Sequence, residues 1–152
     1  MAWFHGRGHP VTGVDRDFAS AQASQCPGTL IAADIESNPW PLLTTSHPTQ
    51  FGAVVVTNYL WRPLLPTLLE SVAPGGVLLY ETFAAGNETV GRPSRADFLL
   101  QPGELLQLCR GWHIVAYENG TLEAPTRFVQ RIAAFKPLPG SDTDLAQKPY
   151  PL

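Results

Sequence analysis

Polar residues that directly follow apolar segments are the best candidates for chemistry in this sequence. The four are Asp15 after Val11–Val14, Asp34 after Thr29–Ala33, Asn58 after Ala53–Thr57, and Glu81 after Val77–Tyr80. Short apolar segments rich in β-branched residues predict buried strands. Ligands of an open parallel sheet bind outside the carboxyl ends of its strands. We therefore expect these four side chains to line one edge of a sheet.

The two aspartates favour a nucleoside as the ligand. A carboxylate at a strand end can accept hydrogen bonds from both hydroxyls of a ribose, and a second carboxylate one strand later can accept from the exocyclic amine of adenine. Asp15 and Asp34 are one strand–helix–strand repeat apart, which suits consecutive strand ends. Each aspartate alone is better explained by helix capping or by a solvated loop charge. Two of them in the same position of consecutive units favour the nucleoside.

The segment Phe51–Glu81 predicts one strand–helix–strand unit around which the chain is organised. Its parts are a buried strand Ala53–Val56, a helix Leu64–Ser71, a turn at Pro74–Gly76 and a strand Val77–Tyr80. Outside this unit we expect a helix end at Ala2–Phe4, strands Val11–Asp15 and Thr29–Ala33, a helix Phe18–Gln25, an irregular segment Leu42–Gln50, a helix Gly103–Arg110, a strand Trp112–Tyr117, a turn at Asn119–Gly120 and a last strand Arg127–Phe135. The last two strands have no helix between them, so we expect an antiparallel pair. The loop Thr82–Pro102 predicts a lid or a substrate loop.

Composition narrows the classes of function. The chain has 152 residues, 44% of them hydrophobic, and a net charge of −3, with no basic cluster, which argues against nucleic acid as a partner. Cys26 and Cys109 have neither metal-site nor disulfide-framework spacing, and the four histidines are scattered, so we expect reduced thiols and no metal. No apolar run reaches the length of a membrane span. We expect a soluble, cytoplasmic protein with one domain, residues 1–136, and a tail, residues 137–152.

Several short motifs together resemble a known family. The ordered motifs VTGVD, LIAAD, VVVTNYL and APGGVLLYE are similar to those of class I S-adenosylmethionine-dependent methyltransferases. The loop YETFAAGNETVGRPSRADFLLQPGELL resembles a small bacterial branch related to the tellurite-resistance methyltransferases. The resemblance covers residues 2–136. It implies an α/β fold of three layers, Rossmann-like, with a mostly parallel sheet, an antiparallel last strand and a truncated N-terminus.

The resemblance also implies roles for individual residues. Asp15 would bind the ribose hydroxyls of S-adenosylmethionine, and Asp34, with Ile35 beside it, would face the adenine. Asn58 and Tyr59 would lie near the methionine part of this cofactor. The residues implied on the substrate side are Glu81, Asn87 and Arg92. For Arg92 and Arg95 a solvated loop charge, and for Tyr59 and Trp61 core packing, remain open as alternatives.

One departure from the family concerns its first strand and glycine-rich loop. The family begins with that strand and a GxGxG-like loop, whereas here Gly6 and Gly8 follow no predicted strand. In the family's sheet the absent strand lies between the strands that correspond to Val11–Asp15 and Phe51–Thr57. The flanking strands could pair directly, a second chain could fill the gap, or Met1 is not the native start. We favour the last as the origin of the sequence, and we expect the chain to form a homo-oligomer.

The predicted function is therefore methyl transfer from S-adenosylmethionine to a small-molecule acceptor, impaired by the missing loop. The first alternative is an inactive methyltransferase-like domain that serves as a binding or assembly module. The second is a nicotinamide-dependent oxidoreductase, but its GxGxxG fingerprint is absent as well.

Overall fold

The structure is a computed structural model that describes residues 1–17, 19, 22, 27–42 and 49–140. These residues belong to two compact units, Met1–His47 and Pro48–Leu152, and each is described by itself. The predicted helix Phe18–Gln25, the middle of Leu42–Gln50 and most of the tail lie mainly outside the described residues. None of the described helices has the length and apolar character that crossing a membrane requires.

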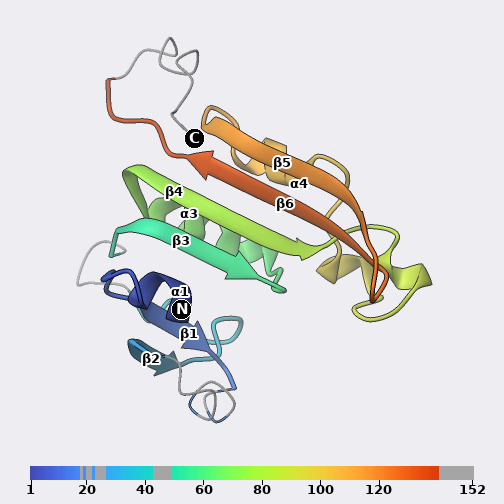
Figure 1. Cartoon of the computed structure of the whole chain (residues 1–152), viewed down its shortest axis with the longest axis horizontal. Coiled ribbons are helices and arrows are strands. Elements are labelled where there is room, and N and C mark those ends of the chain that lie inside the picture. Colours follow the sequence, from blue (N-terminus) through green and yellow to red (C-terminus); the bar gives the residue numbers. More distant parts are fainter. Residues whose placement is uncertain (18, 20–21, 23–26, 43–48, 141–152) are drawn as a thin grey trace. The chain divides into compact units, whose positions relative to one another are not determined.

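The elements described in the Met1–His47 unit are one short helix and two parallel strands (Figure 1). They are α1 (Ala2–His5), β1 (Thr12–Asp15) and β2 (Thr29–Ala32). The amide of Thr29 donates to the carbonyl of Val11 at 2.9 Å and starts the pairing. Gly28 makes this approach possible, because its φ is +104° and a Cβ there would lie 2.4 Å from the Val11 carbonyl oxygen. The predicted strands are confirmed, although each is slightly shorter than expected.

The Pro48–Leu152 unit is built on a sheet of four strands in the order β3-β4-β6-β5 (Figure 1). The strands are β3 (Phe51–Thr57), β4 (Val72–Phe83), β5 (His113–Leu122) and β6 (Arg127–Phe135). β3 is parallel to β4, whereas β6 is antiparallel to both β4 and β5. The Rossmann-like α/β fold with an antiparallel last strand is therefore confirmed.

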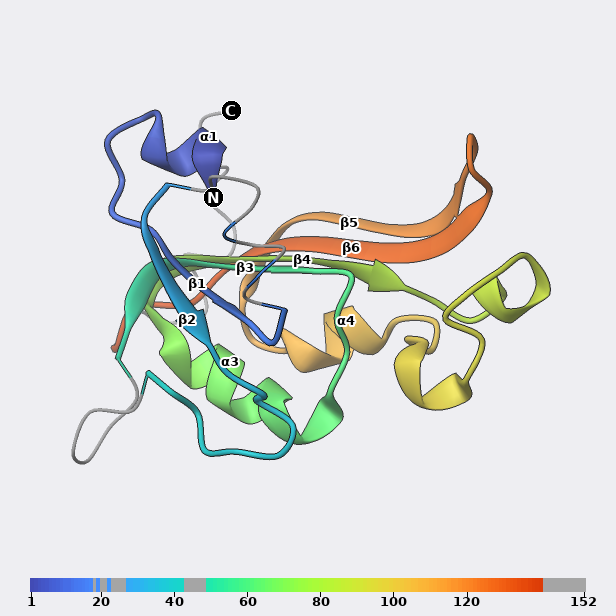
Figure 2. The same cartoon turned by 90° about the horizontal axis from the view of Figure 1, so that it is seen from below.

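Two helices cover one face of this sheet (Figure 2). They are α3 (Leu65–Ser71), which a 3₁₀ turn at Arg62–Leu64 precedes, and α4 (Glu104–Leu108). The side chains of alternate β4 residues are buried on this face of the sheet, and Leu78 and Tyr80 are at most 2% exposed. The core of this unit includes these side chains together with Leu64, Leu65, Leu68, Val72, Leu100, Leu105, Ile132 and Ala134. The apolar helical spacing in the sequence therefore marks the buried face of α3 correctly.

Lys136, which directly follows β6, connects α3 to the sheet by hydrogen bonds. Its ammonium group donates to the carbonyl oxygens of Leu69 and Val72 at 2.8 and 2.7 Å. The last carbonyls of a helix have no partner within the helix, and they carry partial negative charge. Lys136 is distant from α3 in sequence, but its ammonium group provides partners for the carbonyl groups at the end of this helix.

Two expectations about this unit are wrong in part. Among the described strands, β3 lies at one edge of its sheet. Val56 is 8% exposed but Val55 is 48% exposed, so the strand is parallel as predicted but buried on one face only. Asn119 and Gly120 do not form the hairpin turn, because they pair with Gln130 and Val129 inside a longer strand. The turn instead occupies residues 123–126.

The predicted loop Thr82–Pro102 is more ordered than its sequence indicates. β4 continues to Phe83, Ala84 bridges to Leu100, and short 3₁₀ turns form at Asn87–Thr89 and Ala96–Phe98. Leu100 is fully buried, which anchors the returning end of the loop in the core.

A pair of glycine substitutions tests how the loop packs on β6. At Gly86 φ is +105° and a Cβ would lie 2.6 Å from the Phe128 ring, whereas a Cβ at Gly91 meets nothing within 4 Å. We expect Gly86→Ala to lower the free energy of unfolding by about 2 kcal/mol through backbone strain and overpacking. Gly91→Ala should change it by less than about 0.5 kcal/mol. Urea titration measures both, and equal effects would contradict this packing.

Candidate functional site

The two aspartates of the predicted site lie together at the carboxyl edge of the β1–β2 sheet. Asp15 is the last residue of β1, and Asp34 lies two residues beyond the end of β2. The amide of Ala33 donates to the Asp15 carbonyl at 3.1 Å, which holds the two strand ends side by side. The prediction that these residues end neighbouring parallel strands is confirmed.

The two carboxylates differ in exposure, because Asp15 is exposed and Asp34 is half-buried. The hydrogen bond from the Glu36 amide is the largest cause of the lowered pKa of Asp34. Desolvation opposes it, and hydrogen bonds from the hydroxyl and amide of Ser37 lower the pKa further. Asp34 therefore stays ionised at neutral pH, and its carboxylate accepts from the Glu36 amide at 3.1 Å. Asp15 accepts from the Asp17 amide at 2.8 Å. Its exposed side chain is thus the better placed of the two to accept from a ligand.

In the other unit, Asn58 lies where β3 ends. Its φ is +53°, a left-handed conformation that asparagine tolerates better than most residues. Its amide donates to the Glu81 carbonyl at 2.9 Å, which fixes this turn to β4. The neighbouring Tyr59 carbonyl accepts from the hydroxyl of Tyr80 at 2.8 Å, and burial raises the pKa of Tyr80. The backbone that follows β3 is therefore held rigidly, with the Asn58 side chain exposed.

Glu81 lies beside this strand end, but its charge is compensated within the sheet. It pairs with Thr57 of β3 on one side and with Arg131 of β6 on the other. Its carboxylate lies 2.7 Å from Nε of Arg131. Nη1 of the same arginine pairs with Glu118 of β5 at 3.1 Å. Glu81 thus belongs to a row of charged residues across three strands. Its predicted role on the substrate side is not tested by these contacts.

Asn87 and Arg92, the other two residues predicted on the substrate side, have different surroundings. Asn87 is 2% exposed, its amide group donates to the Pro93 carbonyl at 3.0 Å, and its carbonyl accepts from the Phe128 amide at 3.2 Å. These contacts give Asn87 a structural role that ties the loop to β6. Arg92 is exposed in the same loop. For both, binding of a substrate remains a prediction.

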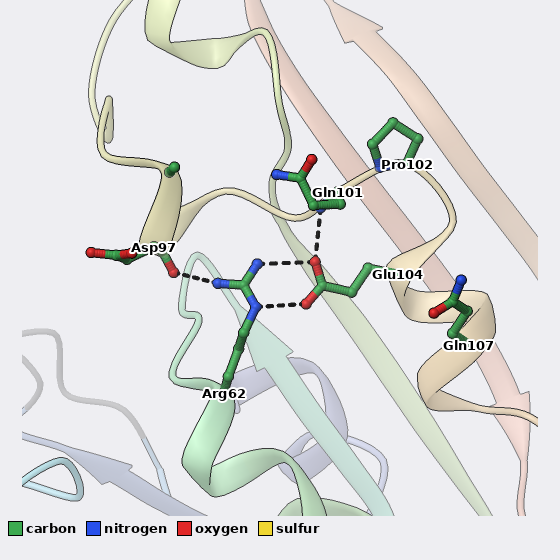
Figure 3. Close-up of a pocket in the computed structure, with 7 residues that line it drawn as sticks. Arg62, Asp97, Gln101, Pro102, Glu104 and Gln107 are labelled. Atoms are coloured by element: carbon green, nitrogen blue, oxygen red, sulfur yellow. Dashed lines mark hydrogen bonds and ion pairs between the residues drawn. The ribbon is translucent and has the colours of Figure 1, made fainter.

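Arg62 is the residue that holds the returning end of the loop in place (Figure 3). Its guanidinium group forms a bidentate pair with Glu104, with Nε and Nη2 at 2.8 and 3.0 Å from the two carboxylate oxygens. The same group donates to the carbonyls of Asp97 at 2.7 Å and Leu99 at 3.0 Å. A planar guanidinium can satisfy all of these acceptors at once, which an ammonium cannot.

The Arg62–Glu104 pair also fixes the charge of both groups. Desolvation acts to raise the pKa of Glu104, but hydrogen bonds from Arg62 and from the Gln101 amide outweigh it, so the pKa is lowered. The hydrogen bond from Glu104 raises the pKa of Arg62. Both groups are therefore charged at neutral pH and neutralise each other.

A hollow of about 470 Å³ lies beside this pair (Figure 3). It is lined by Arg62, Ala96, Asp97, Gln101, Pro102, Glu104 and Gln107. None of the residues predicted for the site is among them. Arg62 is paired with Glu104, and Asp97 with Arg95 at 2.7 Å, so these charges already have partners within the chain. We therefore assign the hollow no ligand and regard it as a consequence of the contacts by which Arg62 holds the loop Thr82–Pro102 in place.

Sequence reasoning gave Arg62 no role. A single arginine in the apolar segment LWRPLL and an acid in the first turn of the helix ELLQL were the available signals. They are 42 residues apart, so no local pattern connects them.

Two arginine substitutions test whether the Arg62 pair is structural. Arg62→Met removes four hydrogen bonds and leaves the partly buried Glu104 without its partner, so we expect a loss of about 2 kcal/mol in the free energy of unfolding. The control is Arg95→Met, because Arg95 and Asp97 form a pair whose side chains are 72% and 71% exposed, and we expect less than about 0.5 kcal/mol. Thermal and urea unfolding measure both. Equal stability of the two variants would refute the structural role.

Comparison with solved structures identifies the fold. TehB from Haemophilus influenzae matches with a TM-score of 0.61 and 18% identity over 85% of this chain and 50% of that one. A SAM-dependent methyltransferase from Methanosarcina mazei matches with a TM-score of 0.61 and 15% identity over 87% of this chain and 84% of that one. The glycopeptide N-methyltransferase MtfA, in complex with S-adenosylmethionine, matches with a TM-score of 0.54 and 17% identity over 88% of this chain and 80% of that one.

Comparison with protein-family models and with curated proteins finds no match. The chain spans half the length of the TehB chain that it matches. At 15–18% identity these likenesses establish a shared fold. The chain therefore has the Rossmann-like fold of S-adenosylmethionine-dependent methyltransferases.

Proposed function

We propose that the chain transfers a methyl group from S-adenosylmethionine to a small-molecule acceptor. The observation that carries the proposal is the placement of Asp15 and Asp34 side by side at the carboxyl ends of parallel strands. In sheets of this type, that edge is where nucleotide-like ligands bind. The fold shared with methyltransferases supports the same cofactor.

The donor and acceptor chemistry of these residues suits the nucleoside part of the cofactor. The Asp15 carboxylate is exposed and accepts one described hydrogen bond, from Asp17, so it can accept two more from vicinal hydroxyls. Asp34 accepts from the Glu36 amide at 3.1 Å, and its carboxylate can also accept from an amine donor. Ile35 is partly buried next to it and offers an apolar contact for a flat base. The residues present therefore fit a nucleoside.

The remaining predicted residues keep their proposed roles. Asn58 and Tyr59 follow β3 and are proposed for the methionine part of the cofactor. Glu81, Asn87 and Arg92 are proposed for the acceptor side. Of these, the exposed Asn58 and Arg92 have the side chains most accessible to a ligand.

Methyl transfer of this kind requires orientation more than acid–base chemistry. The bound cofactor supplies a methyl group on a sulfonium, which an acceptor attacks in line, so proximity and alignment provide most of the rate. The residues of the chain would hold the reactants and exclude water. Cys109 is not a candidate nucleophile, because burial raises the pKa of its thiol to about 11.

The overall charge favours a small acceptor. A net charge of −3 without a basic cluster offers little attraction for a phosphate backbone. An acceptor of low molecular weight is therefore the proposal.

The second candidate function is that of a methyltransferase-like module for binding or assembly. For the third candidate, nicotinamide-dependent oxidation and reduction, we find no favouring observation in the described residues.

Calorimetric titration of the whole chain with S-adenosylmethionine and S-adenosylhomocysteine tests the proposal. We expect binding, and we expect Asp15→Ala to weaken it at least about tenfold, because hydrogen bonds to a charged group contribute about 1.5–3 kcal/mol. Asp34→Asn should weaken binding less, because the asparagine keeps a carbonyl oxygen that can accept from an amine.

The matched control is Asp97→Asn, which removes an exposed carboxylate in the other unit and keeps the backbone carbonyl that Arg62 needs. It should bind like the wild type. A well-folded chain that binds neither ligand would refute the enzyme proposal and leave the binding module. Binding of reduced nicotinamide cofactor instead would favour the oxidoreductase.

A further inference from the structure

We propose that Tyr80 of β4 is a positioning residue for the cofactor, because its hydroxyl holds the backbone after β3 in the shape that the methionine part would meet. The inference rests on the proposed methyl transfer, and it concerns the Pro48–Leu152 unit alone. Asn58 and Tyr59 are the residues proposed to contact this part of the cofactor. Tyr80 would act on the cofactor through them, without touching it.

The place of Tyr80 in the sheet makes its hydroxyl a fixed point. Tyr80 pairs with Val56 of β3 on one side and with Ile132 of β6 on the other, and its side chain is 2% exposed. Its hydroxyl donates to the Tyr59 carbonyl at 2.8 Å. Burial raises the pKa of Tyr80, so this hydroxyl stays protonated at neutral pH and remains a donor.

Two consecutive residues of β4 hold two consecutive residues that follow β3. The Glu81 carbonyl accepts from the Asn58 amide at 2.9 Å, and the Tyr80 hydroxyl holds the carbonyl of the next residue, Tyr59. The bond to Glu81 joins two backbone groups and continues the pairing of the strands, so it does not depend on the side chains there. The bond from Tyr80 depends on a side chain, and a substitution can therefore remove it alone.

The conformation of Asn58 explains why a second contact is needed at this turn. Its φ of +53° lies in the left-handed region, which residues other than glycine adopt rarely. Such a conformation persists only where its surroundings hold it, and residues of this kind cluster at ligand sites. The exposed side chain of Asn58 lies between two anchored backbone groups. Loss of the Tyr80 bond would loosen the backbone directly after it.

A buried tyrosine hydroxyl needs an acceptor in any protein, so the contact also contributes to stability. A second buried hydroxyl separates stability from positioning. Ser71 is 1% exposed, and its hydroxyl donates to the Thr67 carbonyl at 2.8 Å. It precedes Val72, which pairs with Phe51 at the other end of β3. Ser71→Ala therefore removes a bond of the same kind far along the strand from Asn58.

Calorimetric titration of the whole chain with two ligands tests the proposal. S-adenosylhomocysteine carries the amino-acid part of the cofactor, whereas 5′-methylthioadenosine has the same nucleoside and sulfur without it. Tyr80→Phe should weaken binding of the first ligand about fivefold, the effect of one hydrogen bond, and leave the affinity for the second unchanged. Ser71→Ala should bind both ligands like the wild type, and urea titration confirms that both variants fold.

Amide hydrogen exchange measured by NMR tests the same contact without a ligand. The Asn58 amide should exchange faster in Tyr80→Phe than in the wild type, relative to the Lys136 amide. The latter is bonded to the Gly76 carbonyl at 2.9 Å, near the beginning of β4, and serves as an internal reference for overall stability. In Ser71→Ala the ratio of the two rates should equal that of the wild type.

Three outcomes would overturn the proposal. One is a Tyr80→Phe variant that binds S-adenosylhomocysteine like the wild type. Another is an equal loss of affinity for both ligands, since the hydroxyl would then support the fold as a whole. The third is the same loss in Ser71→Ala. A folded wild type that binds neither ligand would refute the proposed methyl transfer and this proposal with it, which distinguishes the two failures.

Discussion

The pairing of β4 on both of its sides is the constraint on which the Pro48–Leu152 unit depends. β4 lies parallel to β3 and antiparallel to β6, and its alternate residues Leu78, Tyr80 and Thr82 are almost fully buried. Both helices of the unit pack on the face that these side chains form. The positions of the strand ends and loops, and hence of the polar residues that follow them, are consequences of this pairing.

Polar side chains in this protein divide into two groups by their surroundings. Arg62, Asn87 and Gln130 are bound on several sides by the chain itself, and they attach the loop after β4 to the rest of the sheet. Asp15 and Asn58 are exposed where strands end, on backbone that hydrogen bonds hold in place. Buried polar groups require partners, so the first group is explained by folding. The second group is available for a ligand.

What could be predicted from the sequence depends on whether the determining contacts are local. The strands at Asp15 and Thr57 were predictable, because apolar segments followed by polar residues are a local signal. The buried face of α3 was predictable from its spacing for the same reason. The placement of Asp15 and Asp34 on neighbouring strand ends follows directly from these strands.

Features decided by distant partners were not predictable. Asn119 and Gly120 have the composition of a turn, but pairing with β6 extends the strand through them. The run Ala53–Val56 indicates burial, yet its exposure depends on which strands flank β3. The contacts of Arg62 and Asn87 join residues about 40 positions apart, so the attachment of the loop, and the structural role of Asn87, appear only in the folded chain.

The most direct test of the central claim is amide NMR of the isotope-labelled chain during titration with S-adenosylhomocysteine. If the strand ends bind the cofactor, shift changes will cluster at Asp15–Asp17 and Asp34–Glu36, with further changes at Asn58. Changes confined to the surroundings of Arg62, or an unchanged spectrum of a folded chain, would contradict the account.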